Sequence, residues 1–177
     1  MNFARSLLMG GFFAVLLAGV SLPASADGGT HLIAGTRFVM EVPNCWNTGY
    51  KDVDDKLFMI FFKDPKSGAA LEGVYLRGTQ PASFKLADFK KARVNGENKR
   101  YDGKGHKVTK ESDAVIAGEK GQYLHTTWKD GGKDMEKHTT LYLKDGNRYL
   151  VVMSGEKGKV DKKVFDHAVK SFAVVKP

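Results

Sequence analysis

Two short glycine-containing breaks in the second half of the chain constrain its fold more than any other feature. Asp145-Gly146 and Gly131-Gly132 each separate two segments that have the length and composition of β-strands. A two-residue connection of this kind joins strands that run antiparallel, because only a tight turn fits between them. The expected strands cover Val108–Ala117, Lys120–Lys129, Lys133–Lys144 and Arg148–Ser154. This half of the chain is therefore predicted to form an antiparallel meander.

The first half adds three expected strands. Arg37–Val42 alternates between apolar and polar residues and stops at Pro43, which cannot donate a hydrogen bond to a neighbouring strand. Leu57–Phe62 is a continuous apolar run, which predicts a strand buried on both faces. Residues 64–68 form a turn sequence, and Ala69–Arg77 returns as the next strand.

Two helices complete the prediction. Ser83 is expected to cap a helix that runs to about Val94 and ends at Asn95-Gly96. The polar segment Lys99–Lys110 is expected to be a loop or the beginning of a strand. Apolar residues that recur every four positions predict a closing amphipathic helix, namely Val160, Val164, Ala168 and Phe172. We therefore expect an α+β fold, a single antiparallel sheet of about six to seven strands flanked by helices.

The beginning of the chain has the three-part pattern of a signal peptide. Arg5 gives a positive start, Leu7–Val20 is mostly apolar, and Ala24-Ser25-Ala26 is a small-residue cleavage pattern. A membrane anchor is the alternative, but the apolar run is shorter than the roughly 20 residues that span a bilayer. The predicted division is a cleaved signal peptide over residues 1–26, a flexible lead over 27–34 and one domain over 35–177. We expect an exported protein, periplasmic or secreted, whose mature chain has no transmembrane helix.

Export changes what the positive charge of the chain implies. The net charge is +8 over 177 residues, and loss of Arg5 with the signal peptide would leave +7 over 151 residues. Nucleic acid is not an expected partner outside the cytoplasm. Anionic lipid head groups, polysaccharide and acidic proteins are the partners that a basic exported protein can meet.

Most of the positive charge lies in one stretch, between Lys85 and Lys110, which holds nine basic and three acidic residues. The predicted contact residues are Lys85, Lys90, Lys91, Arg93, Lys99, Arg100, Lys104 and Lys107. This basic patch is predicted to contact a protein or an anionic envelope component. The alternative is a solvated face that only keeps the protein soluble.

The hairpin register predicts a row of possible metal ligands. If Gly131-Gly132 is a two-residue loop, His125 lies opposite His138, and the loop at Asp145-Gly146 then places Met153 opposite His138. Imidazole and thioether ligands suit copper, and imidazole also suits zinc. The alternative is an ordinary, partly covered sheet surface without a metal.

The sequence shows no motif of a nucleophilic elbow, a zinc protease helix or a phosphate-binding glycine loop. We therefore expect neither catalytic residues nor a cofactor, although a catalytic triad is defined in space and leaves no fixed sequence signature. The single cysteine, Cys45, precedes Trp46 and is expected to be a small buried residue; the alternative is a reactive thiol.

The order of these elements resembles the exported proteins of the PsbP-like and DcrB-like superfamily. The resemblance covers about Gly35 to Val174. The residues that carry it are Val42-Pro43 followed by Trp46, the helix after Pro81, Ile116-Ala117-Gly118, and the ending Phe165, Val169, Ser171 and Phe172. It implies an antiparallel sheet flanked by helices and a binding or assembly role without catalysis, and it transfers no site residues. The alternative function is a small-ligand or metal-binding protein that uses the His125–His138 face.

Overall fold

The computed structural model describes residues 37–53, 56–78, 80–81 and 83–175. The predicted signal peptide and flexible lead therefore lie outside the described residues. In chain order the elements are β1 (Phe38–Val39), β2 (Asn47–Val53), β3 (Leu57–Lys63), β4 (Ala70–Leu76), α1 (Leu86–Arg100), β5 (Lys107–Ile116), β6 (Glu119–Asp130), β7 (Lys133–Lys144), β8 (Asn147–Glu156), α2 (Lys162–Ser171) and β9 (Ala173–Val174). Neither helix is long and apolar enough to cross a membrane within this part of the chain.

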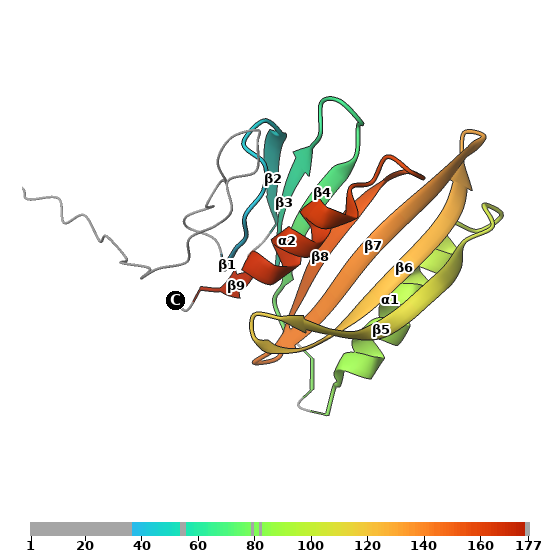
Figure 1. Ribbon diagram of the computed structural model, residues 1–177. Coiled ribbons are helices and arrows are strands. Elements are labelled where there is room, and N and C mark those ends of the chain that lie inside the picture. The colour runs from blue at the N-terminus through green and yellow to red at the C-terminus, as the bar shows by residue number, and fades with distance from the viewer. Residues whose placement is uncertain (1–36, 54–55, 79, 82, 176–177) are drawn as a thin grey trace, which may run out of the picture.

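A seven-stranded antiparallel sheet forms the middle layer of the molecule, with the strand order β2-β3-β4-β8-β7-β6-β5. Helix α2 crosses one face of the sheet and α1 lies behind the other face (Figure 1). Strands β1 and β9 pair in a separate two-stranded sheet. The predicted α+β class and the helices that flank a large antiparallel sheet are confirmed, and the small second sheet is an addition.

Each helix covers its own hydrophobic core. On the α2 side, Phe165, Ala168 and Phe172 pack with buried residues of the central strands. On the α1 side, Phe89 packs with a smaller group from β6, β7 and β8 that includes Leu124 and Leu141. Because successive residues of a strand point to opposite faces, β6, β7 and β8 contribute to both cores. These three strands therefore position any polar site next to a helix.

The predicted hairpin registers are confirmed. His125 lies opposite His138, and His138 lies opposite Met153. Gly131 and Gly132 have φ angles of 53° and 79°. Such positive angles at both central residues are those of a type I′ turn, which fixes the register of the strands around it.

At the beginning of the domain one prediction is wrong and one strand is missed. The alternating segment Arg37–Val42 forms a strand only at Phe38–Val39, because its partner β9 is two residues long. Beyond that pairing the N–H of Glu41 donates to the hydroxyl of Ser171 instead of a strand. Strand β2 is not predicted by the sequence, since its residues are mostly polar. Within the described part of the chain it is an edge strand that pairs only with β3.

The prediction that Leu57–Phe62 is buried on both faces is also wrong. Ile60 and Phe62 are buried, but Phe61, which points to the other face, is 42% exposed. Helix α1 lies over β6 and β7 and leaves this part of the sheet uncovered (Figure 1). The Phe61 ring instead rests on Gly49 of the edge strand, where a Cβ atom would overlap the ring.

Helix α1 differs from its prediction at both ends. It begins after Lys85, whose N–H donates to the Asp88 carboxylate, rather than after Ser83. It continues through Asn95-Gly96 to Arg100, so the first residues of the expected loop are helical. The continuation brings Glu97 onto the sheet, where its carboxylate is buried in ion pairs. Tertiary contacts therefore override the local stop signal.

Candidate functional site

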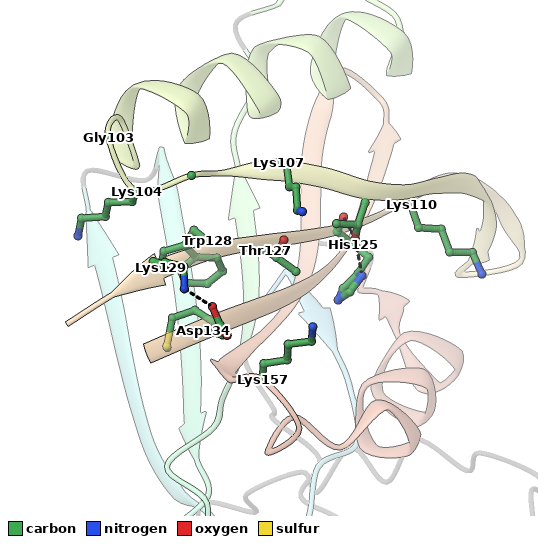
Figure 2. Close-up of a pocket in the computed structure, with 13 residues that line it drawn as sticks. Gly103, Lys104, Lys107, Lys110, His125, Thr127, Trp128, Lys129, Asp134 and Lys157 are labelled. Atoms are coloured by element: carbon green, nitrogen blue, oxygen red, sulfur yellow. Dashed lines mark hydrogen bonds and ion pairs between the residues drawn. The ribbon is translucent and has the colours of Figure 1, made fainter. Parts of the chain in front are cut away.

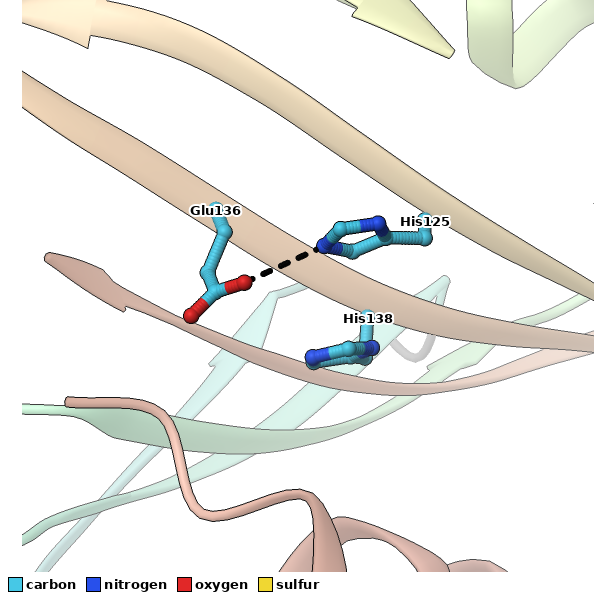
Figure 3. Close-up of side chains that lie close together, drawn as sticks. All are labelled: His125, Glu136 and His138. Atoms are coloured by element: carbon cyan, nitrogen blue, oxygen red, sulfur yellow. Dashed lines mark hydrogen bonds and ion pairs between the residues drawn. The ribbon is translucent and has the colours of Figure 1, made fainter. Parts of the chain in front are cut away.

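A group of three polar residues lies on the α2 side of the sheet. His125 of β6 and His138 of β7 stack with ring centroids 4.6 Å apart and an angle of 16° between the planes. Glu136 precedes His138 by two positions on β7 and so points to the same face. One ligand atom from each of the three residues lies within 4.8 Å of the others (Figure 3). We call this group the histidine site.

The Glu136 carboxylate has few partners for a charge that is largely shielded from water. One oxygen accepts the N–H of Gly158 at 2.8 Å, and the other lies 3.2 Å from Nε2 of His125. The Glu136 side chain is only 13% exposed, and no lysine or arginine of the described residues forms an ion pair with it. Its partners are therefore one backbone N–H and one imidazole nitrogen.

Thr109 positions the ring of His125. Its hydroxyl lies 2.7 Å from Nδ1 of His125 and 3.1 Å from the backbone carbonyl of the same residue. Thr109 is the extra residue of a β-bulge in β5, a feature that redirects a side chain. Nδ1 therefore has an oxygen partner, and Nε2 is the ring nitrogen that faces Glu136.

His138 is held in a similar way. Its Nδ1 lies 2.6 Å from the hydroxyl of Tyr123 on β6. Burial raises the pKa of Tyr123 to about 12, helped by the charges of Asp166 and Glu136, so this hydroxyl stays protonated. Burial and the neighbouring His125 lower the pKa of His138, which keeps this imidazole neutral at pH 7. A neutral imidazole with one fixed nitrogen is the form that can bind a metal.

The residues predicted as metal ligands lie where the register placed them, and one further residue joins them. Met153 lies opposite His138 and is fully buried. Glu136 is not among the predicted ligands, because the prediction rests on pairs directly across strands and Glu136 lies along β7 from His138. The alternation of side chains within one strand is the signal that identifies it.

The predicted basic patch does not form one surface of free charges. Three of its residues are in ion pairs: Lys90 with Glu111 at 2.7 Å, Arg93 with Glu97 at 2.8 Å and Lys104 with Asp130 at 2.7 Å. The exposed residues Lys85, Lys91, Lys99 and Arg100 belong to α1 or its N-cap, and Lys107 belongs to β5. The patch is thus divided between a helix surface and a sheet edge.

A cleft of about 800 Å³ next to the histidine site is lined by several lysines. Five lysines line it together with His125, and they come from β5, β6 and the segments before β5 and after β8 (Figure 2). Lys104 and Lys129 are paired, with Asp130 and with Asp134 at 3.1 Å. The other three, Lys107, Lys110 and Lys157, are exposed, and their ammonium groups have no partner among the described residues. We call this the lysine cleft.

The α1 side of the same strands holds a closed ionic group. Glu97 accepts from Lys137 at 2.9 Å and pairs with Arg93, and His106 lies 3.3 Å from it. The Lys137 ammonium also lies 4.8 Å from the centre of the Tyr101 ring. Burial alone would raise the pKa of Glu97, but the charges of Arg93 and Lys137 outweigh it and hold this pKa below its ordinary value. This group joins α1 to the sheet, and its one carboxylate has two permanent cations as partners within the protein.

Cys45 is exposed, so the prediction of a buried thiol is wrong. It lies in the turn between Pro43 and Trp46, where the N–H of Trp46 donates to the carbonyl of Pro43. Trp46 is 8% exposed. The turn therefore directs the indole inward and the thiol outward.

No protein-family model matches the sequence, and none of the curated proteins matches it. The fold is similar to that of solved structures. Cyanobacterial PsbP from Synechocystis is 15% identical, and the match covers 89% of this chain and 100% of that chain with a TM-score of 0.65. A protein from Bacteroides thetaiotaomicron is 17% identical over 85% of this chain and 49% of that chain, with a TM-score of 0.56. LpqN, described as involved in cell envelope biogenesis of Mycobacterium tuberculosis, is 14% identical over 78% of this chain and 83% of that chain, with a TM-score of 0.50. The resemblance to PsbP that the sequence suggested is confirmed at the level of the fold.

Proposed function

We propose that this protein is a non-catalytic exported binding protein that contacts anionic lipid head groups of the cell envelope through the lysine cleft. The observation that carries the proposal is the grouping of Lys107, Lys110 and Lys157 around one cleft without an acidic partner among the described residues. Unpaired ammonium groups that face the same space attract negative charge, and the attraction is strongest at low ionic strength.

The kind of cation supports a lipid surface as the partner. Lysine is a point charge on a flexible stem, whereas arginine presents a planar fork that recognises one phosphate or carboxylate in a fixed orientation. The residues that line the cleft include five lysines and no arginine. Such a site recognises negative charge rather than the shape of one small ligand. A membrane surface offers many equivalent phosphate groups and meets that requirement.

The geometry next to the cleft supports the absence of catalysis. Thr109, His125 and Glu136 have the residue types of a catalytic triad, and the Thr109 hydroxyl is 2.7 Å from the imidazole. A base activates a hydroxyl by accepting its proton. In a Ser-His-Asp triad the hydroxyl contacts Nε2 and the carboxylate contacts Nδ1. Here the Thr109 hydroxyl lies at Nδ1 and the Glu136 carboxylate at Nε2.

An envelope location is supported by two observations. The first 26 residues have the pattern of a signal peptide. LpqN, which has a similar fold, is described as involved in cell envelope biogenesis. Both fit a protein that meets the anionic surface of a membrane after export.

The proposal is tested by sedimentation of the exported protein with vesicles of phosphatidylglycerol and phosphatidylcholine, or of phosphatidylcholine alone. We expect binding to the anionic vesicles that weakens strongly when salt is raised from about 0.02 M to about 0.5 M. The double substitution Lys107→Glu with Lys157→Glu should weaken binding about 30-fold or more, at about 1 kcal/mol for each lysine removed from the surface.

The matched control is Lys91→Glu with Lys99→Glu, which makes the same change in net charge on helix α1. An equal loss in both variants would assign the effect to overall charge and reject the lysine cleft. Binding that ignores salt, or that is equally strong to neutral vesicles, would reject the electrostatic contact. A soluble anionic polysaccharide that binds more tightly than the vesicles would identify polysaccharide, and not lipid, as the partner.

A further inference from the structure

We infer that His125, Glu136 and His138 bind one Zn²⁺ ion on the α2 side of the sheet. Their ligand atoms lie within 4.8 Å of one another (Figure 3). A tetrahedral zinc with bonds of about 2.1 Å holds its ligand atoms about 3.4 Å apart. His125 Nε2 and the nearer Glu136 oxygen are already 3.2 Å apart, so only His138 has to move toward them.

The contact between His125 and Glu136 brings two possible ligand atoms together. Nδ1 of His125 lies against the Thr109 hydroxyl, so Nε2 is the ring nitrogen that faces the Glu136 carboxylate oxygen, 3.2 Å away. A cation placed between the lone pair of a ring nitrogen and a carboxylate oxygen is attracted by both. His138, whose ring is stacked on that of His125, adds a second imidazole beside the same space.

The surroundings hold the three ligands in place. Thr109 contacts Nδ1 of His125, Tyr123 contacts Nδ1 of His138, and the N–H of Gly158 donates to the second oxygen of Glu136. Metal sites in proteins show this arrangement, in which the nitrogen that does not bind the metal is fixed by an oxygen partner. The β-bulge at Thr109 provides one of these partners. Each of the three ligands thus has a fixed partner before a metal arrives, and His125 and Glu136 are already at the spacing that zinc needs.

The ligand set favours zinc over the copper that a histidine–methionine row would suit. Two imidazole nitrogens, one carboxylate oxygen and an open fourth position are typical of zinc. Calcium and magnesium prefer oxygen ligands only, and Cu²⁺ prefers four ligands in a plane. The His125 and Glu136 side chains are 22% and 13% exposed, so water can reach the fourth position from the lysine cleft side.

The test is a calorimetric titration of the tag-free protein with Zn²⁺ after treatment with a chelator. We expect one ion per protein with a Kd of about 1 µM or lower. Glu136→Gln and His125→Ala should each weaken binding about 100-fold, and Thr109→Val, which removes only the positioning contact, about 10-fold. His167→Ala is the matched control, because His167 pairs with Glu41 at 2.8 Å but has no third ligand in the group. It should leave the affinity unchanged.

A second measurement separates loss of a ligand from loss of the fold. Co²⁺ in place of zinc absorbs strongly in the visible range when it has four ligands and weakly when it has six. We expect the strong band in the unmodified protein and in His167→Ala, and its loss in Glu136→Gln. A circular dichroism spectrum equal to that of the unmodified protein shows that each variant is folded.

Absence of binding up to about 1 mM Zn²⁺ would overturn the inference. So would a six-coordinate cobalt spectrum, or an equal loss of affinity in His167→Ala and Glu136→Gln. No lipid is present in these titrations, and the vesicle experiment contains no zinc. Failure of the zinc site and failure of the proposed lipid contact are therefore distinguishable.

Discussion

Two neighbouring residues of strand β7 place opposite charges on opposite faces of the sheet. Lys137 points toward α1 and reaches Glu97, and Glu136 points toward α2 and reaches His125. Glu97 has two permanent cations within 3 Å, Lys137 and Arg93, whereas Glu136 has none among the described residues. The α1 side therefore has an ionic group whose carboxylate is already paired, and this group stabilises the fold. On the α2 side the Glu136 carboxylate has no lysine or arginine paired with it among the described residues, which is why we assign a ligand to it.

This comparison predicts that the largest loss of stability comes from the α1 side. Lys137→Met leaves Glu97 buried with one permanent cation fewer and removes the contact with the Tyr101 ring. Glu97 keeps Arg93 as a partner, so the expected loss is that of one hydrogen bond to a buried charge, about 1.5 to 3 kcal/mol. Urea unfolding at pH 7 measures this loss in the free energy of unfolding. Lys129→Met breaks an exposed pair and serves as the control, with an expected change below about 0.5 kcal/mol.

The second prediction concerns acid. The pKa of Glu97 in the folded protein lies below its ordinary value of 4.5, since Arg93 and Lys137 outweigh the effect of burial. A carboxylate whose pKa is lowered by folding adds stability above its unfolded pKa and loses that contribution as the pH falls toward the folded pKa. We expect the free energy of unfolding to decrease as the pH falls below 4.5. Glu97→Gln should show a shallower decrease, and an unchanged slope would reject the assignment.

The third prediction applies the same substitution to the α2 side. Without zinc, Glu136→Gln should change the free energy of unfolding by about 1 kcal/mol or less. The amide oxygen can still accept from Gly158, and no lysine or arginine among the residues described loses an ion pair. Glu97→Gln measured alongside should cost more, because it leaves Lys137 and Arg93 unpaired. Equal effects on the two sides would show that Glu136 is as structural as Glu97.

The sequence predicts the residues of the α2 side better than those of the α1 side. The reason is that the α2 side depends on strand register, which local turns determine, whereas the α1 side depends on contacts between distant segments. Two-residue turns fix strand register, so the sequence alone places His125, His138 and Met153 in one row, as the strand pairing confirms. Glu136 can also be found in this way, since it is two residues from His138 on the same strand. The absence of a cation beside Glu136 among the described residues cannot be predicted in this way, because it depends on how the segment around Gly158 returns to the sheet.

The α1 side depends on contacts between distant segments. Glu97 and Lys137 are forty residues apart, and the local sequence places Glu97 just beyond an expected helix end. The exposure of Phe61 cannot be predicted for a similar reason, since an apolar run does not show which face of the sheet a helix covers. The charges of the basic patch can be counted from the sequence, but the sequence does not show that Lys90, Arg93 and Lys104 form ion pairs.

The smallest predicted effect is a stabilisation confined to the α1 side. Gly96 lies inside α1, and a Cβ atom placed on it meets no atom within 4 Å. Gly96→Ala should raise the free energy of unfolding by between about 0.5 and 1 kcal/mol, since glycine loses more backbone freedom in a helix than alanine. The zinc affinity should not change, because α1 and the histidine site lie on opposite faces of the sheet.

Combining Gly96→Ala with Lys137→Met tests why the helix passes through Asn95-Gly96. If the buried Glu97 holds the last turns of α1 in place, loss of Lys137 lets those turns fray, and the alanine then stabilises a segment that is less often helical. The gain from Gly96→Ala should therefore be smaller in the Lys137→Met protein than in the unmodified protein. Equal gains would mean that the helix reaches Arg100 without the ionic group, and the contrast between the two sides of β7 would then rest on charge compensation alone.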